Sequence, residues 1–147
     1  DMRVEPFLLP SSLNLMVAQR LVPQLCQKCK KAETPSQEIQ AIIKKELGKI
    51  PKEIIENWKL KIENFQTYHS PGCKDCKNKG VSGRIAIFEV FRMTSELKEI
   101  INSGPTEHKI LEEAKRQEML TLRQDGIIKA LQGLISMEVV LRETMEM

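Results

Sequence analysis

The sequence has 147 residues, a formal net charge of +3 and 41% hydrophobic residues, few of them aromatic. This length and composition permit one moderate hydrophobic core or two small ones. Lysine is interleaved with glutamate, which is typical of solvated surfaces and counts against a basic nucleic-acid groove. No apolar run approaches the roughly 18 residues that a membrane span needs. The sequence starts at Asp1 without an initiator methionine, so we expect a fragment of a longer protein.

The first segment, residues 1–25, predicts a helix after Pro10. Residues recur there at helical spacing: Leu13, Met16, Val17, Arg20 and Leu21. Pro23 is expected to end this helix and to begin a short extended piece. Arg20 would then lie near the C-terminal end of the helix dipole, and a contact with an anion or a neighbouring subunit is the alternative.

Four cysteines form two pairs with the same Cys-x-x-Cys spacing, Cys26 with Cys29 and Cys73 with Cys76. Each such turn can place two thiolate sulfurs about 2.3 Å from a shared Zn²⁺, so two turns complete a tetrahedral site. Four bound sulfurs leave no position for a water, which indicates structural and not catalytic zinc. We predict these four cysteines as the zinc ligands and assign no catalytic residue to this chain.

Four cysteines also permit uses other than zinc binding. An iron–sulfur cluster also accepts four thiolates, a disulfide framework suits a small secreted chain, and a redox pair needs only one Cys-x-x-Cys. His69 could replace a thiolate. The formal charge of about −2 on zinc with four thiolates would be offset by nearby lysines. These are Lys28, Lys30, Lys31, Lys74, Lys77 and Lys79. Thiols kept for metal suit a reducing compartment, so we expect the cytoplasm.

The segment between the cysteine pairs predicts a helical insert at 34–65. Thr34 begins a capping-box pattern, and Ile39, Ile42, Ile43 and Leu47 follow on one face until Gly48. A second helix is predicted from Pro51, with Trp58 in the core of the resulting helical hairpin. Residues 68–72 predict a turn. Gly80 to Arg84 predicts a bend, and residues 85–91 predict a strand.

Short capped helices are predicted from Thr94 to the end of the chain. The capping residues are Thr94, Thr106, Thr121 and Ser136, and Gly104 and Gly133 interrupt the series. Thr121 and Gln124 form a capping-box pattern, while Ile135 and Val140 are placed as a hydrophobic staple. We expect these helices to pack on a small core of their own, with His108 exposed on one of them.

Three groups of residues carry a resemblance to a known family. The first comprises Val4-Glu5-Pro6-Phe7-Leu8, Ser11-Ser12-Leu13 and Ala18-Gln19-Arg20-Leu21-Val22, running into Leu25-Cys26. The second comprises Gly72-Cys73, Gly80, Gly83-Arg84 and Glu89-Val90. The third comprises Thr121-Leu122, Asp125-Gly126, Lys129, Gly133, Glu138 and Leu141-Arg142. In this order they resemble the end of the RecA-like core, the second zinc knuckle and the helical extension of type II secretion and type IV pilus assembly ATPases. Arg3, Pro23, Val81 and Ala86 depart from the family pattern.

The resemblance implies a mainly helical α+β chain with three parts. These are residues 1–25 as the end of a RecA-like ATPase core, 26–92 as a tetracysteine zinc-binding subdomain, and 93–147 as a helical extension. It also implies a cytoplasmic hexamer, peripheral to the inner membrane, that contacts sibling subunits and a membrane assembly platform. ATP and Mg²⁺ would bind only the parent protein, because this chain contains no Gly-x-x-x-x-Gly-Lys-Ser/Thr phosphate loop. The alternative is a free-standing zinc-ribbon-like module that binds nucleic acid or a protein adaptor.

Overall fold

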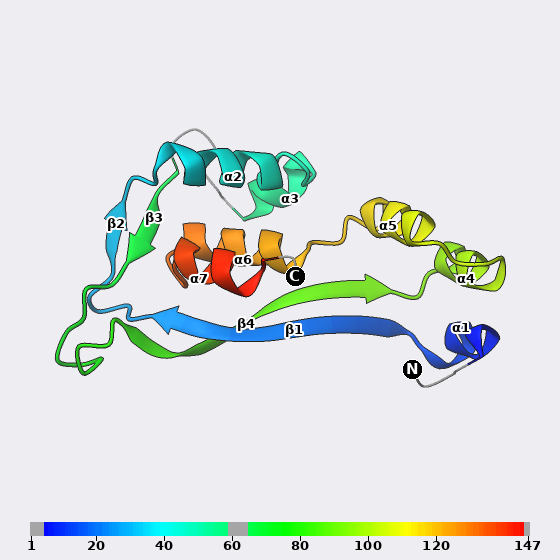
Figure 1. Cartoon of the computed structure of the whole chain (residues 1–147), viewed down its shortest axis with the longest axis horizontal. Coiled ribbons are helices and arrows are strands. Elements are labelled where there is room, and N and C mark those ends of the chain that lie inside the picture. The colour runs from blue at the N-terminus through cyan, green and yellow to red at the C-terminus, as the bar shows by residue number, and fades with distance from the viewer. Residues whose placement is uncertain (1–4, 59–64, 146–147) are drawn as a thin grey trace. The chain divides into compact units, whose positions relative to one another are not determined.

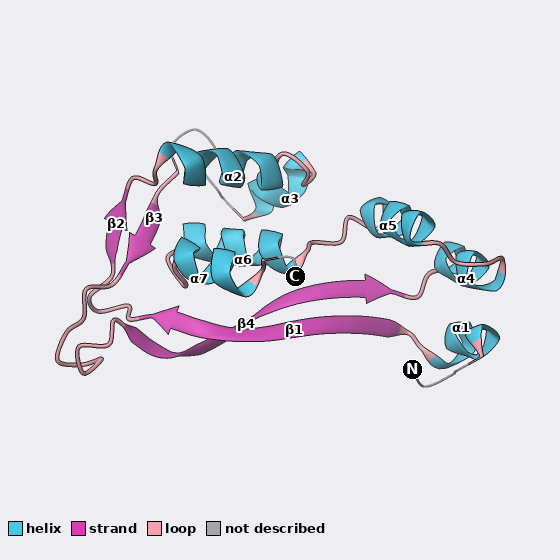
Figure 2. Cartoon of the chain, in the orientation of Figure 1, coloured by secondary structure: helices cyan, strands magenta, loops and turns pink. Residues whose placement is uncertain are grey.

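The structure is a computed structural model that describes residues 5–58 and 65–145. Val4 of the family resemblance, Arg3, which departs from the family pattern, and residues 59–64 of the predicted insert lie outside the described residues. The elements are η1 (Pro6–Leu8), α1 (Leu9–Ser12), β1 (Leu15–Leu25), β2 (Lys31–Glu33), α2 (Gln37–Leu47), α3 (Lys52–Asn57), β3 (Thr67–His69), β4 (Val81–Arg92), α4 (Ser95–Asn102), α5 (Glu107–Arg116), α6 (Leu122–Leu131) and α7 (Met137–Glu143) (Figures 1 and 2). The chain is therefore mixed α and β, as predicted.

The chain divides into two compact units. The first contains residues 1–18 and 89–119, and the second contains residues 19–88 and 120–147. No helix within residues 5–58 and 65–145 combines the length and apolar character needed to cross a membrane.

The predicted helix after Pro10 is wrong, because residues 15–25 form strand β1, which pairs with β4. The two arrows point in opposite directions (Figure 1). Tertiary pairing with β4 overrides the helical spacing, and Val22 is fully buried while its neighbour Leu21 is 53% exposed. Arg20 therefore ends no helix of its own, and its guanidinium donates to the carbonyl of Glu143 at the end of α7.

Proline fits within β1 because of the direction in which its backbone nitrogen points. The Asn14 carbonyl accepts the N–H of Met93 at 3.0 Å before the strand, and the N–H of Cys26 donates to the Gly80 carbonyl at 2.9 Å after it, so the backbone groups of even-numbered residues face β4. Pro23 is odd-numbered, so its missing N–H lies on the edge away from β4. A proline at this position removes no bond from the β1–β4 ladder.

A second two-stranded sheet was not predicted. Strands β2 and β3 pair antiparallel, with Ala32 opposite Tyr68 and Glu33 opposite Thr67. The predicted turn at 68–72 thus begins two residues too early, inside β3. The predicted strand at 85–91 is confirmed, but β4 is longer, so residues 81–84 of the predicted bend belong to the strand.

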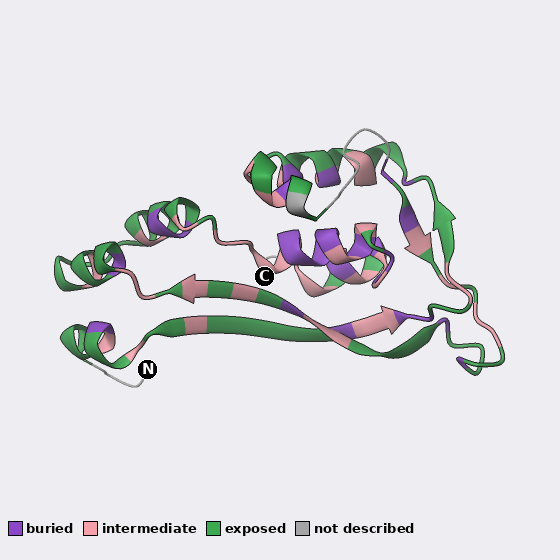
Figure 3. Ribbon diagram, turned by 180° about the vertical axis from the view of Figure 1, so that it is seen from behind, coloured by how far each residue is buried: buried purple, intermediate pink, exposed green. Residues whose placement is uncertain are grey.

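Helix α6 is at the centre of the second unit's core. Its residues Ile127, Ile128 and Ala130 are at most 1% exposed and pack with Ile43 and Leu47 of α2. Figure 3 shows buried residues concentrated on α6. Helix α6 also packs against α7, where a Cβ at Gly126 would lie 3.0 Å from the Val140 side chain, so a larger residue at position 126 would require that side chain to shift.

The predicted helices of the insert are confirmed, but their cap and their packing differ from expectation. Ser36, not Thr34, is the N-cap of α2, and its hydroxyl accepts the N–H of Ile39. The apolar faces of α2 and α3 join the core around α6. Trp58 is 37% exposed and not the core of a hairpin, as the prediction had it.

All four predicted caps of the C-terminal helices are confirmed. The hydroxyls of Thr94, Thr106, Thr121 and Ser136 accept N–H groups in the first turns of α4, α5, α6 and α7. The helices do not share one small core, however. Helices α4 and α5 belong to the first unit, whereas α6 and α7 belong to the second.

A buried ion pair joins α6 to strand β4. Asp125 and Lys129 have side chains only 9% and 12% exposed and lie 2.5 Å apart. The Asp125 carboxylate also accepts the N–H of Phe88 at 2.8 Å, and the Lys129 ammonium donates to the carbonyl of Ala86 at 2.8 Å. Two side chains thereby satisfy backbone groups that a neighbouring strand would otherwise bind.

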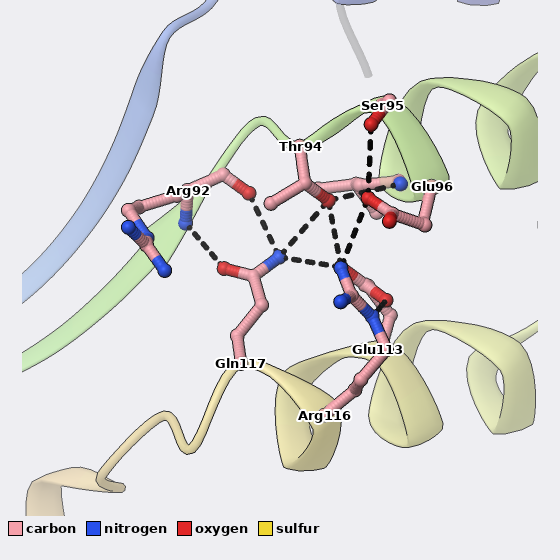
Figure 4. A network of polar contacts seen from close by, with 8 residues as sticks. Arg92, Thr94, Ser95, Glu96, Glu113, Arg116 and Gln117 are labelled. Carbon is pink, nitrogen blue, oxygen red and sulfur yellow. Dashed lines mark hydrogen bonds and ion pairs between the residues drawn. The ribbon is translucent and has the colours of Figure 1, made fainter.

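A polar network ties α5 to the end of β4 in the first unit (Figure 4). The Arg116 guanidinium donates to both oxygens of the buried Glu113 carboxylate, at 2.6 and 2.9 Å. The Thr94 hydroxyl donates to the same carboxylate at 2.7 Å. The Gln117 amide accepts from the N–H of Arg92 and donates to its carbonyl, each at 3.0 Å. This network positions Thr94, the N-cap of α4, and satisfies the backbone N–H and C=O of Arg92, the last residue of β4.

The Asp125 pair predicts a large loss of stability on truncation. Asp125→Ala leaves Lys129 buried without a carboxylate and the Phe88 N–H without its acceptor, so the free energy of unfolding should fall by about 3–5 kcal/mol. Urea denaturation followed by circular dichroism measures this. In the control Glu112→Ala, which removes the 64% exposed partner of His108, the change should stay within about 0.5 kcal/mol. Equal effects of the two changes would contradict the assignment.

The network around Glu113 predicts a pH dependence. The Arg116 hydrogen bonds, assisted by Thr94 and Gln117, outweigh burial and lower the pKa of Glu113 from 4.5 to about 2. Its contribution to stability is therefore complete above about pH 4.5 and is lost as the pH falls towards 2. Carboxyl NMR titration should show Arg116→Met raising this pKa towards its ordinary value. Arg92→Met should leave it unchanged, because Arg92 joins the network through its backbone.

Candidate metal centre

The structure brings the four cysteines together. Their sulfur atoms all lie within 4.8 Å of one another, and no other such group of histidine, cysteine and acidic side chains occurs in the described part of the chain. The Sγ atoms of Cys26 and Cys73 are 3.9 Å apart, those of Cys29 and Cys76 are 4.0 Å apart, and those of Cys73 and Cys76 are 3.7 Å apart. The two pairs thus meet across the two turns as the spacing predicts.

These separations fit one tetrahedral metal ion. Four sulfurs placed about 2.3 Å from a zinc ion are separated by about 3.8 Å along each edge of the tetrahedron. A disulfide requires about 2.05 Å between sulfurs, and all four cysteines are free. An iron–sulfur cluster inserts several atoms between its ligands and holds them farther apart than a single ion does.

The second turn is shaped by glycines and by hydrogen bonds to sulfur. The N–H groups of Cys73 and Gly80 donate to the Sγ of Cys76 at 3.1 and 3.3 Å. Gly72 and Gly80 have φ values of +104° and +71°. A Cβ at Gly80 would lie 2.3 Å from the Ser70 carbonyl oxygen, so no side chain fits there. Glycine at positions 72 and 80 therefore allows this turn to close around the Cys76 sulfur.

Gly80 also serves the first turn, which sequence reasoning did not assign. Its carbonyl accepts the N–H of Cys26 at 2.9 Å, so one glycine contacts both cysteine pairs through its backbone. The Ser70 hydroxyl donates to the Cys26 carbonyl at 3.3 Å. The signal available in the sequence was the pair of glycines that flank the second cysteine turn.

Burial and hydrogen bonding act differently on the thiols. Burial raises the pKa of the Cys76 thiol, but the N–H groups of Cys73 and Gly80 outweigh it and bring this pKa down to about 6. At Cys29 burial prevails and raises the pKa to about 12. The hydrogen bonds within its own turn thus favour the thiolate form of Cys76.

The lysines near the cysteines have distinct roles. The Lys28 ammonium lies 2.7 Å from the Asp75 carboxylate and links the two turns, although both side chains are more than half exposed. Lys30 instead donates to the carbonyl of Gly133, at the end of α6. Lys30 therefore has a structural partner on α6 in addition to any effect of its charge on the cysteines.

The two histidines lie outside the cysteine group. The Nδ1 atom of His69 is 2.8 Å from the Glu33 carboxylate, so the structure gives no support for His69 as a replacement ligand. His108 is exposed on α5, as predicted, and its Nδ1 atom lies 3.4 Å from the Glu112 carboxylate.

Comparison with known proteins agrees with the arrangement of the motifs. Residues 1–142 match the family described as "Type II/IV secretion system protein". The chain belongs to this family. Similar proteins include the type IV pilus assembly ATPases PilB of Myxococcus xanthus, 38% identical over 144 residues, and of Thermus thermophilus, 36% identical over 146 residues. The type II secretion system ATPase E of Vibrio cholerae is 34% identical over 146 residues.

The family matches cover nearly all of this chain but a small part of each relative. The alignments include 98%, 99% and 99% of the chain in the order given, but only 24%, 15% and 26% of the three relatives. The chain therefore spans about a quarter or less of the length of the curated relatives named here. Pilus and secretion members of the family are both similar to it at comparable identity.

Proposed function

We propose that this chain is the C-terminal zinc-binding region of an ATPase that powers type IV pilus assembly or type II secretion. Membership of the family supports the motor assignment, since the relatives are named as ATPases of these two systems. It also favours this function over a free-standing zinc-ribbon module. In the parent protein, which we expect to be hexameric, residues 1–25 would complete a RecA-like core.

The proposed role of Cys26, Cys29, Cys73 and Cys76 is to hold one structural zinc ion. The single observation that carries this role is the approach of four sulfurs to within 4.8 Å of one another, with three of their separations between 3.7 and 4.0 Å. Bound zinc would supply a strong crosslink between two turns that are far apart in the sequence. With four sulfur ligands the ion keeps no open position, so its function would be structural.

The parent protein would supply the chemistry. Phosphoryl transfer needs a phosphate cradle and bound Mg²⁺, and this sequence contains no P-loop motif to provide them. We propose that the region transmits motion between the motor and its surroundings, at the cytoplasmic face of the inner membrane. Sibling subunits and a membrane assembly platform are the proposed partners, and nucleic acid is not proposed as a partner.

The metal role predicts a defined stoichiometry. The purified chain should contain about one zinc ion, measured by inductively coupled plasma mass spectrometry after dialysis. Cys73→Ser should lose most of this metal and unfold at lower temperature, because one tetrahedral ligand is missing. His69→Ala is the matched control and should retain one ion. Absence of metal from the wild type, or full occupancy in Cys73→Ser, would refute the proposed site.

The assignment of catalysis to the parent predicts that this chain alone does not bind nucleotide. Titration with ATP and Mg²⁺, followed by isothermal calorimetry, should show no saturable binding up to millimolar concentration. A dissociation constant in the micromolar range would show that the chain has a phosphate site of its own and would contradict this part of the proposal.

A further inference from the structure

The C-terminal end of α6 is built around Gly133. The N–H of Gly133 donates to the Ala130 carbonyl at 3.0 Å, and the N–H of Leu134 donates to the Lys129 carbonyl at 2.9 Å. These two bonds, with φ of +70° at Gly133, form a Schellman motif. The carbonyl groups of Gly133 and Leu134 remain directed away from the helix and are available to another segment.

The first cysteine turn occupies these carbonyl groups. The carbonyl of Gly133 accepts from the Gln27 amide and from the Lys30 ammonium, each at 3.1 Å. The carbonyl of Leu134 accepts the N–H of Leu25 at 2.8 Å. Leu25, Gln27 and Lys30 lie immediately around Cys26 and Cys29 in the sequence. The first cysteine pair is therefore held in place from outside its own turn.

Electrostatics and steric contacts both favour this docking. A cation at the C-terminal end of a helix interacts favourably with the helix dipole, and the Lys30 ammonium also lies 5.3 Å from the centre of the Tyr68 ring. A Cβ at Gly133 would approach the Lys30 Nζ to 2.9 Å and the Tyr68 ring to 3.1 Å. Any side chain at position 133 would displace the lysine that docks the turn.

The two cysteine pairs depend on different supports. The second pair closes around Gly72 and Gly80 and receives its N–H···S bonds from within residues 73–80. In contrast, the first pair is anchored at the end of α6 by three hydrogen bonds, which its neighbours Leu25, Gln27 and Lys30 donate. Because α6 also carries the Asp125–Lys129 pair and the core residues Ile127 and Ile128, the docking links the cysteines to the packed centre of the second unit.

We propose that metal binding by the four cysteines is energetically coupled to the end of α6, with Gly133 and Lys30 as the positioning residues that carry the coupling. This inference rests on the proposed metal site. Binding of the ion fixes the Cys26–Cys29 turn. That turn then holds the C-terminal end of α6. By thermodynamic reciprocity, a change at Gly133 alters metal affinity although this residue touches no sulfur.

Metal affinity of glycine variants tests the coupling. Zinc dissociation constants are measured by competition with a chromophoric chelator. Gly133→Ala should weaken zinc binding by about 5- to 50-fold, in the range typical of coupled sites. Gly104→Ala is the matched control, since Gly104 also has positive φ, at +94°, but a Cβ there meets nothing within 4 Å. It imposes similar backbone strain and should leave the affinity within about twofold.

A second pair of variants avoids backbone strain altogether. Lys30→Met keeps an unbranched aliphatic side chain and removes the ammonium, and it should weaken zinc binding by about fivefold. Lys79→Met removes an equal charge beside the cysteines without touching α6, and it should change the affinity less than twofold. Equal effects of Lys30→Met and Lys79→Met would mean that charge near the metal, and not docking, is responsible.

Hydrogen exchange of the wild-type chain gives an independent readout. On chelation of the metal, amides of residues 128–134 should lose at least tenfold protection, while those of α4 stay unchanged. If zinc binds but Gly133→Ala matches Gly104→Ala in affinity and protection at 128–134 is unaffected by chelation, the coupling is overturned and the metal site stands. If the wild type binds no zinc, both fail together.

Discussion

The fold of the second unit depends on how α6 satisfies the edge of β4. An edge strand has unpaired backbone N–H and C=O groups on its outer side, and burying these groups without partners costs free energy. Here Asp125 accepts from the N–H of Phe88 and Lys129 donates to the carbonyl of Ala86, so that a helix takes the place of a further strand. The two side chains neutralise each other, which makes their burial tolerable. The same helix can then present its apolar residues to α2 and α7.

Gln117 solves the same problem by the same means in the first unit. Its amide both accepts from and donates to the backbone of Arg92, as a neighbouring strand would. The two units thus use side chains of helices to complete a single strand, β4. This explains why Asp125 is buried on α6, where a simple amphipathic pattern would place it at the surface.

Features set by nearby residues could be predicted from the sequence. The caps Thr94, Thr106, Thr121 and Ser136 act within one helical turn, and the cysteine spacing follows from coordination chemistry. Features set by distant residues could not. The apolar residues around Val17 and Leu21 fit a helix in isolation, and only pairing with β4 makes them a strand. Strands β2 and β3 are three residues each, too short to show a period, and the docking of Lys30 on Gly133 joins segments far apart in the chain.

Pro23 has a consequence beyond its compatibility with β1. Its nitrogen has no hydrogen to offer on the outer edge of that strand, and the next outward N–H, that of Leu25, is already bound to Leu134. A foreign polypeptide that aligned with this edge would lose its register of bonds before reaching Cys26. From Pro23 to Leu25 the outer edge of β1 therefore has no backbone donor free for a further strand, directly before the turn that contains Cys26.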